Sequence, residues 1–125
     1  MENDDLGTKR GTRLKLALIM QTLDDRDRIF PIGDGRTVIG RDGRCDLRLP
    51  IPTISRHHCE IVLENKRAVL LNKDDAMETL VNGSAISRTQ LADEDVVQIG
   101  PVTFRVSMTV VDQGGPTDMT IQREN

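Results

Sequence analysis

The sequence predicts an all-β protein, a two-sheet antiparallel β-sandwich with few or no helices. Turn signals recur about every 8 to 12 residues, which is the spacing typical of a sandwich or a barrel. The runs between these turns are short and rich in valine, isoleucine and leucine, which favours strands. We find no apolar stripe with the 3.6-residue period of a helix and with caps at its ends.

Glycines, prolines and asparagine mark the ends of the expected strands. A Gly-Asp-Gly segment at 33–35 separates two apolar runs, and two prolines follow the short run over 47–49 and end it. Asn82-Gly83 is the strongest short hairpin signal in the chain. We expect strands within residues 14–23, 28–32, 36–41, 47–49, 58–64, 67–72, 79–83, 95–100 and 102–111.

The length of 125 residues fits one domain that is large enough to bury a core. Residues 1–12 and 112–125 are polar and aperiodic, so we expect flexible ends around a domain over residues 13–111. No stretch approaches the roughly 18 apolar residues of a transmembrane helix. Two cysteines cannot form a disulfide framework, and the plain expectation is a reducing, cytoplasmic setting.

The charges divide into a basic segment and an acidic remainder. The chain has 20 acidic and 17 basic residues, and its net charge of −3 argues against a general nucleic-acid binder. Within residues 41–58, however, Asp42 and Asp46 stand against four arginines, at positions 41, 44, 48 and 56. This is a basic patch on an acidic chain, and we expect it in loops at one end of the sandwich, where binding sites usually lie.

Three short motifs follow one another in and beyond this segment. They are Gly40-Arg41, Ser55 with His58 in a Ser-x-x-His pattern, and Asn82-Gly83. In this order and within an all-β pattern they resemble the forkhead-associated (FHA) domain, over about residues 14–108. That family is a β-sandwich that binds phosphothreonine peptides. The resemblance implies a non-enzymatic signalling module for a Thr-phosphorylated protein or peptide, downstream of a Ser/Thr kinase.

The resemblance also implies a role for each motif residue. The implied phosphate ligands are Arg41, Ser55 and Arg56. The implied loop-structural residues are Gly40, His58, Asn82 and Gly83, with His58 bracing its loop by hydrogen bonds and Asn82 steadying the neighbouring recognition loop. Two simpler interpretations stay open. Arg41 would then be an ordinary cation at a strand end, and Ser55 a turn residue that bonds its own backbone.

One segment departs from the family pattern. Aligned from the Asn-Gly hairpin, the family's Ser/Thr-Asn-Gly-Thr segment falls on Ala76, Met77 and the two residues after them. Relatives use the first two positions for a phosphate hydrogen bond and for holding the peptide backbone, and alanine and methionine make neither contact. A local gap would shift Asn72 or Asp74 towards these roles. The alternative hypothesis is therefore an FHA-fold protein-interaction module that no longer depends on phosphate.

An enzymatic interpretation has one candidate group of residues, the adjacent His57, His58 and Cys59. Consecutive side chains on a strand point to opposite faces, so these groups diverge. No further acid, base or ligand stands at a suitable spacing. We expect no catalysis, no metal and no cofactor, and no nucleic-acid or membrane partner.

Thr117 and Thr120 lie in the polar C-terminal segment, where a kinase could reach them. A phosphorylated threonine there would be tethered to the domain at an effective concentration near the millimolar range. It could occupy the phosphate site of the same molecule and block it. The simpler interpretation is that both are ordinary tail residues.

Overall fold

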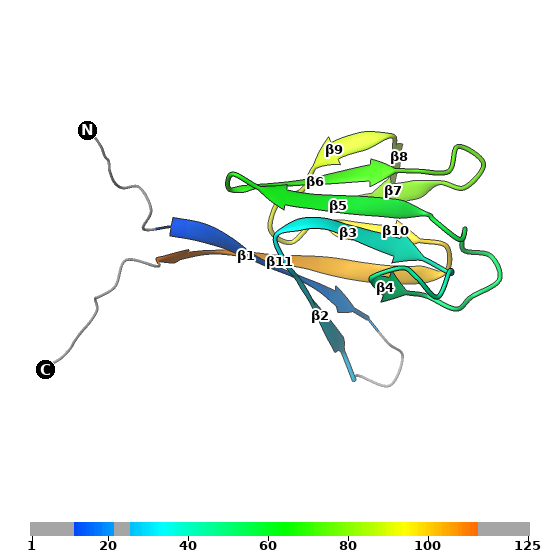
Figure 1. Cartoon of the computed structure of the whole chain (residues 1–125), viewed down its shortest axis with the longest axis horizontal. Coiled ribbons are helices and arrows are strands. Elements are labelled where there is room, and N and C mark those ends of the chain that lie inside the picture. Colours follow the sequence, from blue (N-terminus) through cyan, green and yellow to red (C-terminus); the bar gives the residue numbers. More distant parts are fainter. Residues whose placement is uncertain (1–11, 22–25, 113–125) are drawn as a thin grey trace, which may run out of the picture.

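The computed structural model describes residues 12–21 and 26–112, and within these ranges the chain forms strands and turns without a helix. Two sheets pack face to face as a sandwich (Figure 1). The predicted all-β sandwich is thereby confirmed. Across the described ranges there is no helix that could span a membrane.

The first sheet has the strand order β2-β1-β11-β10-β7-β8, and the second has the order β4-β3-β5-β6-β9. In chain order the strands are β1 (Thr12–Met20), β2 (Arg28–Ile32), β3 (Gly35–Gly40), β4 (Leu47–Arg48), β5 (Cys59–Glu64), β6 (Arg67–Asn72), β7 (Thr79–Val81), β8 (Ser84–Ile86), β9 (Arg88–Gln90), β10 (Val96–Ile99) and β11 (Val102–Asp112).

The longest strand pair is β1 with β11, which run antiparallel from Thr12 opposite Asp112 to Met20 opposite Phe104. The short pair of β3 and β4 is parallel, with Ile39 opposite Leu47. The antiparallel expectation therefore needs one refinement at this edge. The chain leaves β3, turns through the next six residues and returns to its starting direction before β4.

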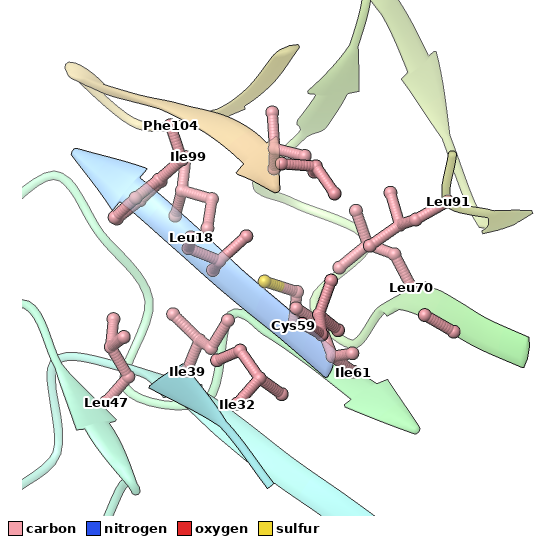
Figure 2. Close-up of a cluster of buried hydrophobic side chains, with 14 of the residues drawn as sticks. Leu18, Ile32, Ile39, Leu47, Cys59, Ile61, Leu70, Leu91, Ile99 and Phe104 are labelled. Atoms are coloured by element: carbon pink, nitrogen blue, oxygen red, sulfur yellow. The ribbon is translucent and has the colours of Figure 1, made fainter. Parts of the chain in front are cut away.

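The core lies between the two sheets because every second side chain of the central strands points inward. Figure 2 shows Leu18 and Phe104 of the first sheet meeting Ile39, Ile61 and Leu70 of the second. A fully buried aliphatic side chain contributes roughly 1.5–3 kcal/mol. With only two aromatic residues in the chain, this aliphatic packing carries most of the stability.

Two short strands were absent from the sequence-based expectation. β8 follows the Asn-Gly turn and pairs with β7, so the hairpin signal was recognised while its second strand was not. β9 pairs with β6 in the other sheet, which means that the chain crosses between the sheets after β8. Each has only three residues, too few to show an alternating pattern.

Three loops gather at one end of the sandwich, the right-hand end in Figure 1. They are the β3–β4 loop (41–46), the β4–β5 loop (49–58) and the β6–β7 loop (73–78). The first residues of β1 and the last residues of β11 lie at the opposite end. The chain reaches the loop end repeatedly, so residues far apart in sequence can form one site there.

Candidate functional site

Gly40 ends β3 at a point where two backbones touch. A Cβ at this position would overlap the carbonyl oxygen of Arg56, so a larger residue would push the segments apart. Hydrogen bonds between backbone groups continue the contact. Arg41 N donates to Ser55 O at 2.9 Å, and Asp42 N donates to Arg56 O at 3.2 Å. The end of β3 and the β4–β5 loop therefore form one unit.

Arg41 directs its half-buried side chain along the β4–β5 loop, where Nε donates to Ile54 O at 2.9 Å. That bond uses one of the five N–H donors of the guanidinium, and the other four lie on the two Nη atoms. Arg48 Nε donates to Arg41 O at 3.2 Å, and both arginines line a shallow pocket with Pro50 and Pro52. Two cations therefore share one edge of the loop cluster.

Ser55 is buried, with 8% of its surface exposed, and its hydroxyl donates to Oδ2 of Asp74 at 2.6 Å. This bond connects the β4–β5 and β6–β7 loops. It lowers the pKa of Asp74 below its ordinary value, and the backbone N–H of Ala76 acts in the same direction. The carboxylate is therefore ionised at neutral pH, and the hydroxyl expected to face phosphate already faces an anion.

His58 is almost fully buried, with 1% of its surface exposed, and it also connects these two loops. Its Nδ1 accepts the backbone N–H of Ser55 at 3.2 Å, so Nε2 carries the ring proton and donates to Glu78 O at 2.9 Å. The backbone of His58 adds bonds to Ile39 O and from Lys73 N, both at 2.9 Å. The imidazole thus has a structural role, since its two hydrogen bonds hold the β4–β5 and β6–β7 loops together.

Within the β6–β7 loop, the side chain of Asp74 and the side chains of the two flanking strand residues, Asn72 and Thr79, make further hydrogen bonds. Asp74 Oδ1 accepts the N–H of Ala76 at 2.9 Å, and Asp74 O accepts the N–H of Met77 at 3.0 Å. Asn72 donates from Nδ2 to Asp74 O at 3.1 Å and accepts from Thr79 Oγ1 at 2.8 Å. Of the two residues that the gapped alignment offered, Asp74 reaches Ser55, while Asn72 supports the loop from inside.

Arg56 is exposed and lies away from this network. Its side chain lines a pocket with Arg44, Cys45, His57 and Asp42. Arg44 bonds to Asp42 through its side chain and its backbone N–H, and these bonds, helped by the charge of Arg56, lower the pKa of Asp42. The four arginines of the basic segment therefore surround two pockets rather than one.

Asn82 and Gly83 form the tight turn between β7 and β8, with φ values of 52° and 87°. Both lie in the left-handed region, which this type of hairpin turn requires. Asn82 donates from Nδ2 to Asp95 Oδ1 at 2.9 Å and accepts from Val96 N at 2.9 Å. These bonds tie the hairpin to the start of β10. The expected effect of Asn82 on the recognition loop stays a prediction.

The FHA domain model matches residues 37–100, just over half of the 125 residues. The matched range contains the end of β3, the three loops and the Asn-Gly hairpin. The chain belongs to the FHA domain family. FHA domains are phosphothreonine-binding modules.

This FHA domain is similar to short regions of much longer curated proteins. It is 32% identical over 92 residues to the FHA domain-containing protein FhaA of Mycobacterium tuberculosis, covering 74% of this chain and 18% of that protein. It is 35% identical over 77 residues to the human proliferation marker protein Ki-67, covering 61% of this chain and 2% of that protein. The chain thus spans a small fraction of either relative.

Solved FHA structures share the same sandwich. One, from a study of phosphothreonine-dependent FHA domain interactions, has a TM-score of 0.69 and 30% identity, covering 76% of this chain and 97% of that one. The FhaA FHA domain complexed with the intracellular domain of Rv3910 has a TM-score of 0.64 and 31% identity, covering 74% and 98%.

Cys59, which the enzymatic interpretation grouped with the two histidines, points into the core of this FHA domain (Figure 2). Burial raises the pKa of its thiol to about 12, so the thiol stays protonated at neutral pH. His57 is exposed and pairs with Glu60, with Nε2 and Oε2 2.6 Å apart. The cysteine and this histidine therefore face different environments and share no reaction site.

Proposed function

We propose that this FHA domain binds protein segments that carry phosphothreonine, with Arg41 and Ser55 as phosphate ligands. Arg56, which lines a second pocket with Arg44, stays a predicted ligand. The observation that carries the proposal is the attachment of Arg41 to the β4–β5 loop. Its backbone N–H bonds to Ser55 O and its Nε to Ile54 O, so the cation and the serine belong to one rigid unit.

The chemistry of this unit suits a phosphate group. A phosphothreonine carries about −1.5 to −2 charges and three acceptor oxygens. The Nη atoms of Arg41 offer paired donors, and Arg48 adds a second cation beside them. Each charge-assisted hydrogen bond contributes roughly 1.5–3 kcal/mol. Two or three such bonds give phosphorylated segments a clear preference over unphosphorylated ones.

The proposal is tested by fluorescence anisotropy with a pool of phosphothreonine peptides of randomised flanking sequence and with the same pool unphosphorylated. Arg41→Ala is expected to weaken binding of the phosphorylated pool at least tenfold, which corresponds to about 1.4 kcal/mol. Arg67→Ala is the matched control, because Arg67 is an exposed arginine at the start of β6, at the opposite end of the sandwich. Equal loss in both variants would reject Arg41 as a phosphate ligand.

A second candidate function is protein binding that does not depend on phosphate. The observation that favours it is the bond from Ser55 to Asp74, because this serine hydroxyl is already engaged with a carboxylate. Under this alternative both peptide pools bind with equal affinity or neither binds. The same titration therefore separates the two functions.

The proposal extends to the C-terminal segment, although Thr117 and Thr120 lie outside the described residues. If either threonine is phosphorylated and occupies the site, the phosphorylated chain competes with an external phosphopeptide. Undiminished binding of the external peptide by the phosphorylated chain argues against such a contact. The segment would then serve as an ordinary tail.

A further inference from the structure

Asp74 is held in place by two hydrogen bonds to its carboxylate and two to its backbone carbonyl oxygen. Oδ2 accepts the hydroxyl proton of Ser55 at 2.6 Å, and Oδ1 accepts the N–H of Ala76 at 2.9 Å. The carbonyl oxygen of Asp74 accepts from Asn72 Nδ2 at 3.1 Å and from Met77 N at 3.0 Å. The loop is thus built to hold this side chain against Ser55, and the contact is a structural element of the site.

A serine hydroxyl has one hydrogen to donate, and a carboxylate and a phosphate are both acceptors. When Oδ2 of Asp74 takes that hydrogen, no donor remains on Ser55 for a phosphate oxygen. The two anions also repel each other at such short range. A phosphate that uses Ser55 must therefore displace the carboxylate of Asp74.

We propose that Asp74 regulates the phosphothreonine site, because its carboxylate takes the place of a phosphate oxygen on Ser55 and must leave before the ligand can use the hydroxyl. This inference rests on the function proposed above. In the absence of ligand, the Asp74 carboxylate occupies the Ser55 hydroxyl. The affinity of the site for phosphothreonine is therefore lower than Arg41 and Ser55 alone would provide.

Asp74→Asn tests this with the least disturbance of the loop. The amide oxygen still accepts the N–H of Ala76, and the amide nitrogen can donate to Oγ of Ser55. The serine hydrogen is then available to a phosphate, and one negative charge is gone. We expect the phosphorylated peptide pool to bind at least tenfold more tightly, while binding of the unphosphorylated pool does not change.

The matched control is Asp75→Asn. Asp75 is the next residue of the same loop and is exposed, so its substitution removes the same charge at nearly the same place without touching the Ser55–Asp74 bond. A gain confined to Asp74→Asn supports displacement from Ser55. Equal gains in both variants mean a general charge effect and overturn the proposal, and so does weaker binding by Asp74→Asn.

A double-mutant cycle adds an independent test. In a Ser55→Ala background the gain from Asp74→Asn is expected to fall below threefold, because the hydroxyl that it releases is missing. A full gain in that background overturns the proposal. If Asp74→Asn fails to fold, as judged by urea unfolding, Asp74→Ser replaces it, since serine keeps an acceptor for the loop N–H without the charge.

Failure of the parent proposal has a different signature. If neither the wild-type chain nor Asp74→Asn distinguishes the two peptide pools, phosphate recognition itself is rejected, and Arg41→Ala will have no effect. If Arg41→Ala weakens binding while Asp74→Asn leaves it unchanged, the site reads phosphate and Asp74 does not control it.

Discussion

The β4–β5 loop and the β6–β7 loop face each other at the same end of the sandwich, but they are held by different kinds of contact. The β4–β5 loop is attached to the end of β3 through backbone bonds and through the close approach at Gly40. The β6–β7 loop is held largely through side chains. Asn72, Asp74 and Thr79 bond within it and its flanking strands, and Ser55 and His58 bond to it from the β4–β5 loop. A single substitution can change the chemistry of the second loop while the first keeps its shape.

The most damaging change to this arrangement is expected at the backbone contact. Gly40→Ala places a methyl group against Arg56 O, and a backbone atom cannot move aside as a side chain can. We expect the free energy of unfolding to fall by about 3 kcal/mol, the upper range for overpacking. Urea denaturation measures it.

Gly43→Ala is the matched control for that experiment. Gly43 lies in the neighbouring β3–β4 loop, and a Cβ there has no atom within 4 Å. Its unfolding free energy is expected to change by less than about 0.5 kcal/mol. A similar loss in both variants would mean that the contact at Gly40 does not hold the loops together.

A smaller effect is expected from restoring the family residues in the β6–β7 loop. Ala76→Thr with Met77→Asn adds donors near the ligand, but Asp74 still engages Ser55. We expect phosphopeptide affinity to rise about threefold, within the range of one net hydrogen bond, as measured by anisotropy. Ala85→Thr on β8 is the control, because Ala85 is exposed outside the loop cluster. No gain, even combined with Asp74→Asn, would contradict the alignment.

The smallest expected effect concerns pH. The Ser55 hydroxyl, and then the Ala76 N–H, lower the pKa of Asp74 in the folded state from 3.8. A lowered carboxyl pKa contributes stability that is present above the unfolded value and is lost as pH falls through the folded value. Wild type and Asp74→Asn should therefore differ in urea midpoint at pH 7 and converge as the pH falls below 3.8 and through the lowered pKa of Asp74. A difference that grows on acidification would contradict the assigned bond.

The sequence was sufficient for the sandwich and for most of its strands, because alternation and turn residues are local signals. β8 and β9 were missed because three residues show no period, and β9 depends on pairing with β6 across the chain. The parallel direction of β4 likewise depends on where the chain returns after β3.

In the site, too, local motifs could be predicted from the sequence, while contacts between distant residues could not. The motif order in the sequence indicates Gly40, Arg41, Ser55 and His58 as one group, and the structure brings them together. The bond between Ser55 and Asp74 joins residues 19 positions apart and follows from the path of the β6–β7 loop. The sequence shows that Asp74 precedes Ala76, but only the path of the loop shows that its carboxylate meets Ser55.

The length of β11 determines how far the C-terminal residues lie from the ligand loops. A Cβ at Gly100 would lie 2.8 Å from Ile54 Cγ1, so the ligand loops adjoin the Val102 end of β11. Ten residue steps of about 3.3 Å separate that end from Asp112 by roughly 33 Å. Thr117 is five residues beyond Asp112 and can extend at most about 18 Å, and Thr120 about 29 Å. A phosphorylated Thr117 would therefore reach the site of a second molecule before its own, in a head-to-tail contact whose occupancy rises with protein concentration.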